Sequence, residues 1–177
     1  MKTTAHIRTI TLAAAVFGLG MTMAAHAVSP REAAALNKTM LTLTQATQIA
    51  EKQEPSKTIS VEFDIEKDVP LWEVKVLGKE GVKEYKIDAA SGVVLKVEDE
   101  RTRGKLAKLV TGMNLKDIEN AKTSLGQAIS AAEKKLNGKA VKVQVEHEHG
   151  GIQYDIFVRT GDKTTKLKID ANTELPR

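Results

Sequence analysis

The sequence predicts an α+β fold in which one small module, a helix packed on a three- to four-stranded antiparallel sheet, occurs twice in tandem. The first observation is an internal repeat, because an offset of 82 residues aligns residues 42–95 with 124–177 without a gap. The second is strict alternation of apolar and polar residues, which is typical of strands covered on one side. The third is a matching helix-start signal in each copy, at Thr42 and at Ser124.

The repeat keeps one register through several predicted elements. The run KIDA at residues 86–89 recurs at residues 168–171, and six residues of the segment 43–52 recur in the segment 125–134. Apolar strand positions match at the same offset. A shared helical period would not hold one register through a helix and three strand patterns, so we infer a duplicated module.

The first 27 residues have the pattern of an export signal. Lys2 and Arg8 form a basic start, residues 9–25 carry no charge, and Ala25-His26-Ala27 places small residues where a signal peptidase reads. The alternative is an uncleaved membrane anchor, but threonines and glycines interrupt a stretch that is already short of the ~20 apolar residues of a spanning helix. We expect a signal peptide at residues 1–27, a periplasmic mature protein and no membrane insertion after cleavage.

Composition excludes several functional classes. The chain has no cysteine, which rules out disulfides, thiolate metal sites, a cysteine nucleophile and the lipid-bearing cysteine of a bacterial lipoprotein. The net charge of +4 includes two charges from the signal segment, and acidic and basic residues alternate along most of the remainder. A nucleic-acid-binding surface needs clustered basic residues, so we expect no nucleic-acid partner.

The first module, residues 28–100, is predicted to contain two helices followed by four strands. A helical pattern covers residues 30–40, and a capping box at Thr42 and Gln45 opens a second helix that Pro55-Ser56 ends. Alternating strands follow, the last of them after the turn at residues 88–92. Their apolar residues are Ile59, Val61, Phe63 and Ile65, then Trp72, Val74 and Val76, then Tyr85 and Ile87, then Val93, Leu95 and Val97.

The second module, residues 114–177, repeats this order after a linker helix predicted at residues 101–113. The linker carries apolar residues at helical spacing, and a short helical pattern at residues 114–122 precedes the main helix. The main helix starts at Ser124 and ends at Asn137-Gly138. The last turn of the second module is followed by a single apolar residue, Leu175. We therefore expect the second sheet to lack one strand and to leave an open edge.

The joint pattern resembles a known family. The run LTLTQATQIAEKQ, an alternating strand and PLWEVKVLGKEGVKEYKIDAASGVVLKVEDE are similar to a PepSY domain, and SLGQAISAAEKK through GIQYDIFVRTGDKTTKLKIDANTE is similar to a second one. PepSY domains accompany the propeptides of secreted metallopeptidases. The resemblance implies a helix on an antiparallel sheet, an extracytoplasmic place and a role in restraining peptidases. It implies no catalytic residue and no cofactor.

Three sets of residues are candidates for a site, each with a structural alternative. His147 and His149 point the same way in a strand, about 7 Å apart, and can bind one metal ion, although a third ligand would be needed and an exposed polar strand end is the preferred explanation. Asp88 and Asp170 recur at the start of a turn, where aspartate accepts backbone amides. Trp72 and Tyr154 alternate with valines and are predicted to be core residues.

No arrangement of residues resembles a catalytic centre. The chain lacks a G-x-S-x-G elbow and a phosphate-binding glycine loop outside the signal segment, so we expect no enzyme. Besides a purely structural envelope protein, two hypotheses remain. The first is a protein- or peptide-binding module that modulates a peptidase, reached by strand addition at the open edge. The second is a sensor or buffer of divalent cations that uses His147 and His149.

Overall fold

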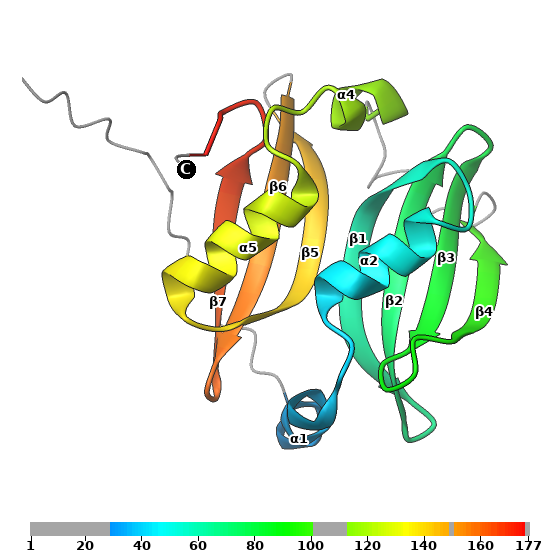
Figure 1. The fold of residues 1–177 in the computed structure, drawn as a ribbon, viewed down its shortest axis with the longest axis vertical. Coiled ribbons are helices and arrows are strands. Elements are labelled where there is room, and N and C mark those ends of the chain that lie inside the picture. Colours follow the sequence, from blue (N-terminus) through cyan, green and yellow to red (C-terminus); the bar gives the residue numbers. More distant parts are fainter. Residues whose placement is uncertain (1–28, 101–112, 149–150, 176–177) are drawn as a thin grey trace, which may run out of the picture.

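The computed structural model describes residues 29–100, 113–148 and 151–175, which form one seven-stranded antiparallel sheet with the helices on one face (Figure 1). The predicted signal peptide lies outside the described residues, as does the linker helix except for its last residue, Met113. In the part of the chain that the structure describes, no helix is both long and apolar enough to span a membrane.

Both copies of the module follow the same order of elements. Copy 1, residues 29–100, contains α1 (Pro30–Lys38), α2 (Leu43–Glu51), β1 (Ser56–Glu66), β2 (Val69–Gly78), β3 (Gly81–Asp88) and β4 (Val94–Asp99). Copy 2, residues 113–175, contains α4 (Leu115–Glu119), α5 (Leu125–Leu136), β5 (Lys139–Glu148), β6 (Gly151–Thr160) and β7 (Lys163–Asp170). The predicted fold class of two helix-on-sheet modules is therefore confirmed.

Local capping explains where the main helices begin and end. Thr42 accepts the backbone N–H of Gln45 while the Gln45 side chain accepts the N–H of Thr42, and Ser124 and Gln127 do the same in copy 2. These reciprocal bonds satisfy amides that a helix start leaves unpaired, as the sequence predicted. At the other end of α5, Asn137 adopts the left-handed conformation at φ 47°, which stops the helix before Gly138.

The two sheets merge into one, which the sequence did not predict. The strand order is β4-β3-β2-β1-β5-β6-β7, and β1 pairs with β5 through Ser60–Gln144, Val61–Val143 and Glu62–Lys142. Val61 and Val143 are equivalent residues of the two copies. Because this antiparallel pairing is centred on equivalent residues, an approximate two-fold axis relates the copies and passes through their shared edge.

Equivalent contacts hold the helices on the sheet in both copies. The Trp72 indole N–H donates to the Leu41 carbonyl at 3.0 Å, and the Tyr154 hydroxyl donates to the Thr123 carbonyl at 3.1 Å. Both aromatic side chains are 1% exposed, which confirms their prediction as core residues. The aromatic ring of the second strand thus fixes the segment that enters the main helix in each copy.

The face of the sheet opposite the helices is covered by paired charges. Lysines and acidic residues alternate between neighbouring strands there, so the surface needs no second layer. The ion pairs on this face include Lys75–Glu84 at 2.9 Å, Lys86–Glu66 at 2.7 Å, Lys86–Glu73 at 3.1 Å, Lys142–Glu62 at 2.8 Å and Lys168–Glu148 at 3.4 Å.

Candidate binding sites

The outer edge of β7 is open within the described part of the chain, as predicted for the second sheet. β7 pairs with β6 on one side, and no strand among the described residues pairs with its other side. After Asp170 the chain makes a turn and forms no further strand as far as Leu175. In copy 1 the equivalent strand, β3, is covered by β4 (Figure 1). Copy 1 therefore shows what an added strand on β7 looks like.

The side chains of β7 define the chemistry of this edge. Leu167 and Ile169 point toward α5 and are buried, at 0% and 5% exposure. Lys166 and Lys168 point to the helix-free face, where both form ion pairs with Asp155. Lysines at an edge discourage like edges from pairing with each other, because two copies would bring the same charges together. The edge is thus better suited to a different partner than to a second β7.

The opposite outer edge belongs to β4 and is apolar. The predicted fourth strand is confirmed, but its apolar residues are not core: Val93, Leu95 and Val97 are 57%, 52% and 51% exposed. The reason is the placement of α2, which lies over β1 and β2 and leaves the outer strand uncovered (Figure 1). The alternating pattern alone could not show how far the helix reaches.

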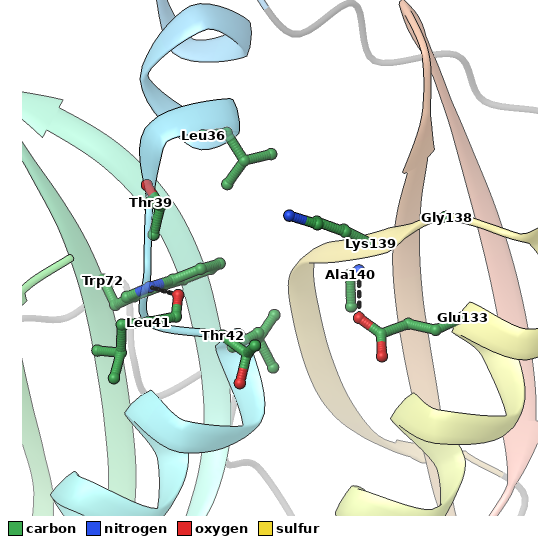
Figure 2. A pocket seen from close by; sticks show the side chains of 10 residues that line it. Leu36, Thr39, Leu41, Thr42, Trp72, Glu133, Gly138, Lys139 and Ala140 are labelled. Atoms are coloured by element: carbon green, nitrogen blue, oxygen red, sulfur yellow. Dashed lines mark hydrogen bonds between the residues drawn. The ribbon is translucent and has the colours of Figure 1, made fainter. Parts of the chain in front are cut away.

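A cavity of about 230 Å³ lies at the seam between the two copies. Copy 1 contributes the segment from α1 to the start of α2 together with Trp72, and copy 2 contributes the end of α5 and the start of β5 (Figure 2). We refer to it as the seam cavity. Its lining residues are Leu36, Thr39, Leu41, Thr42, Leu43, Trp72, Glu133, Gly138, Lys139 and Ala140. The sequence offered no signal for it, because it exists only where the copies meet.

Lys139 is the cation of the seam cavity. Its side chain extends from β5 across the gap toward copy 1, near Leu36 and Thr39 (Figure 2). Glu133 lies on the α5 side, and one of its carboxylate oxygens accepts the Ala140 N–H at 2.8 Å. The cavity therefore combines apolar walls with one lysine and one carboxylate that is already bound to the backbone.

The predicted metal pair is only partly described. His147 is exposed at the end of β5, and His149 lies outside the described residues. Within the described ranges, no group of three or more histidine, aspartate and glutamate side chains could hold an ion.

The recurring aspartates have a structural role. The Asp88 carboxylate accepts the backbone N–H groups of Ala90 and Ser91 at 3.1 and 2.7 Å, and the equivalent Asp170 accepts that of Asn172 at 2.8 Å. The pKa of Asp88 is lowered, mainly by the hydrogen bonds that its carboxylate accepts from Ser91. The turn-capping interpretation of these residues therefore agrees with the structure.

The fold and its edges define a class of protein, namely a tandem helix-on-sheet module with exposed strand edges. A family model described as the peptidase propeptide and YPEB domain, PepSY, matches residues 40–98 and 122–173. These two regions span more than half of the chain, so the chain belongs to the PepSY family and carries two tandem copies of the domain. The family resemblance predicted from the sequence is confirmed.

No curated protein matches the chain. Among solved structures, the chain is similar to the crystal structure of a protein from Clostridium difficile 630 that is provisionally described as a lipoprotein. The two sequences are 19% identical, the TM-score is 0.44, and the match covers 75% of this chain and 88% of that chain.

Proposed function

We propose that this protein is a non-enzymatic, exported binding module that captures an extended segment of a protein partner on β7 and thereby restrains a peptidase. The observation that carries the proposal is the outer edge of β7, which pairs with no strand of the described residues and so is available for strand pairing with another chain. Membership of a family named after peptidase propeptides supports a peptidase as the partner. The basic and charge-free start of the sequence supports export and a periplasmic location.

The geometry of copy 1 indicates how the partner would bind. β4 pairs antiparallel with β3 through Lys83–Asp99, Tyr85–Val97 and Ile87–Val94. On β7, Thr165 is equivalent to Lys83, Leu167 to Tyr85 and Ile169 to Ile87. A segment of five to six residues in extended conformation would complete the second sheet in the same way, with backbone hydrogen bonds supplying most of the affinity.

The test is to cover the outer edge of β7 with an added strand that belongs to the same chain. A tail that carries residues 93–99 after a short glycine-serine spacer is added after Arg177, and a control variant carries a glycine-serine tail of equal length. We expect the first tail to occupy β7 and to reduce peptidase capture at least about tenfold, because an intramolecular strand acts at high effective concentration. The measurement is crosslinking in the native envelope, followed by inhibition assays on the captured peptidase.

The control decides between competing explanations. Loss of capture with the strand tail, and not with the glycine-serine tail, supports pairing at β7. Equal capture by both variants would remove β7 as the binding edge. Capture of partners that include no peptidase would remove the peptidase part of the proposal.

A further inference from the structure

The seam cavity is lined by one lysine, Lys139, which is exposed at the start of β5. Lys139 forms no ion pair within the described part of the chain, although its side chain extends over the cavity (Figure 2). We propose that the seam cavity binds a small carboxylate with an apolar chain, its carboxylate at the Lys139 ammonium and its chain among the apolar walls. This ligand site goes beyond the proposed function, because it lies at the centre of the sheet and not at the β7 edge.

The walls of the cavity suit an apolar chain. Leu36, Leu43, Trp72 and Ala140 line it and are 5%, 2%, 1% and 3% exposed with the cavity empty, and Leu41 is partly exposed beside them. They come from both copies, so an occupant would contact both at once. Each methylene group that leaves water for such walls strengthens binding about fourfold.

The neutral hydrogen-bond donors of the cavity are already engaged. The Thr39 hydroxyl donates to the Ala35 carbonyl at 3.1 Å, and the Thr42 hydroxyl donates to the Gln45 side chain at 3.0 Å. The Trp72 indole donates to the Leu41 carbonyl. The Lys139 ammonium is therefore the donor that remains for a ligand, and an ammonium selects an anionic acceptor.

Glu133 determines which way round a ligand would bind in the seam cavity. Its carboxylate lies beside α5, away from the Lys139 tip, and accepts the Ala140 N–H, which fixes its position there. A ligand carboxylate would be repelled there and attracted to Lys139. The expected orientation therefore places the head group at the mouth under Lys139 and the apolar chain toward Trp72.

The duplication supplies a matched control. Lys57 and Thr58 are the residues of copy 1 that are equivalent to Lys139 and Ala140. Lys57 likewise forms no ion pair among the described residues, but it does not line the seam cavity. Thr58 is buried, at 1% exposure, which shows that this position accepts a β-branched side chain. Ala140→Val is thus a tolerable substitution that fills the cavity.

The experiment uses the tryptophan of the cavity as its reporter. Trp72 is the only tryptophan in the chain, so tryptophan emission reads occupancy of this site directly. The mature protein is titrated with octanoate and with N-acetyl-leucine, and with N-acetyl-leucinamide as the uncharged analogue. We expect a saturable change with a carboxylate and at least about tenfold weaker binding of the amide.

The variants separate the site from a non-specific effect. Lys139→Gln and Ala140→Val are each expected to weaken binding about tenfold, and Lys57→Gln is expected to leave it unchanged. Binding of octanoate alone would assign a fatty acid, and binding of N-acetyl-leucine alone a peptide carboxyl terminus. The absence of a saturable change with both carboxylates would overturn the proposal, as would equal affinities in Lys139→Gln and Lys57→Gln.

Discussion

At the scale of single residues, Trp72 and Tyr154 are different side chains that have the same structural role in the two copies. Each is buried at the same place in its copy, and each donates one hydrogen bond to the carbonyl before the main helix. For Tyr154, burial first and the nearby Glu51 second raise the pKa to about 12. The phenol therefore remains a donor at physiological pH, as the indole does at every pH.

Glu73 is a residue whose charge opposes folding. Burial on the helix-free face raises the pKa of its carboxyl, and repulsion from Glu84 and Asp64 adds to that effect against the hydrogen bond from Lys86. A raised pKa means that folding favours the protonated form. The charged form at neutral pH therefore costs stability, and acidification through the raised pKa relieves that cost.

We expect Glu73→Gln to raise the melting temperature at pH 7, and the gain to shrink as the pH falls and the wild-type carboxyl becomes protonated. Lys86 keeps a partner in the variant, because Glu66 lies 2.7 Å from it. The measurement is thermal unfolding of both proteins across the acidic range. A loss of stability at pH 7 would mean that the Lys86–Glu73 ion pair outweighs the burial of the carboxylate.

Glu66 provides the control of opposite sign. The hydrogen bond from Lys86 lowers the pKa of Glu66, so folding favours its charged form. The charged Glu66 carboxylate stabilises the folded protein at pH values above the ordinary pKa of glutamate. This stabilisation is lost as the pH falls through the lowered pKa of the folded state. Glu66→Gln should therefore not stabilise the protein at pH 7, and any effect should fade in acid.

At the scale of elements, each main helix is tied to the strand that follows it. The register of β1 shifts between Thr58 and Ser60, and that of β5 shifts at the equivalent place, between Ala140 and Lys142. In copy 1 the Glu51 carboxylate at the end of α2 accepts the Thr58 N–H at 2.8 Å. A bulge disturbs the regular ladder, so the glutamate supplies an acceptor beside it.

We expect Glu51→Ala to lower the free energy of unfolding by about 2 kcal/mol, because it leaves a buried backbone N–H without an acceptor. Glu51→Gln keeps an acceptor oxygen and should cost clearly less. Urea denaturation of both variants gives the comparison. Equal losses in the two variants would show that the negative charge, and not the hydrogen bond to Thr58, is what matters at this position.

The elements themselves could be predicted from the sequence, and their limits only in part. The starts of the main helices could be predicted from Thr42 and Ser124, because a helix cap is a local interaction among neighbouring residues. The bulges were not predicted, since the extra residues Ile59 and Val141 keep an apolar side chain and look like ordinary strand residues. The exposure of Leu95 was not predicted either, because the register of β4 shifts there: Lys86 pairs with Lys96 and Ile87 with Val94, so Leu95 is the extra residue.

At the scale of the whole molecule, the continuous sheet and the seam cavity could not be predicted. The repeat shows that the copies share a fold, but it contains nothing about which edges of two like modules meet. That choice depends on three residue pairs centred on Val61 and Val143, which are far apart in the sequence. The open edge at β7 was predicted, and no strand among the described residues pairs with it.

The shared sheet predicts that both copies unfold together. Trp72 reports on copy 1 alone, because it is the only tryptophan, whereas far-ultraviolet circular dichroism reports on both copies. A change confined to copy 2 should therefore move the fluorescence transition of copy 1. Tyr154→Phe is such a change, since it removes the hydroxyl that donates to the Thr123 carbonyl.

We expect Tyr154→Phe to cost about 1 kcal/mol of unfolding free energy and to shift the Trp72 fluorescence and circular dichroism transitions in urea by the same amount. The physical reason is that β1 and β5 pair in one sheet, so that either copy alone exposes an edge and the seam side of its core. If the Trp72 transition stays in place while circular dichroism divides into two steps, the copies unfold independently. The β1–β5 pairing would then be too weak to unite the two copies, and the seam cavity would not hold a fixed shape.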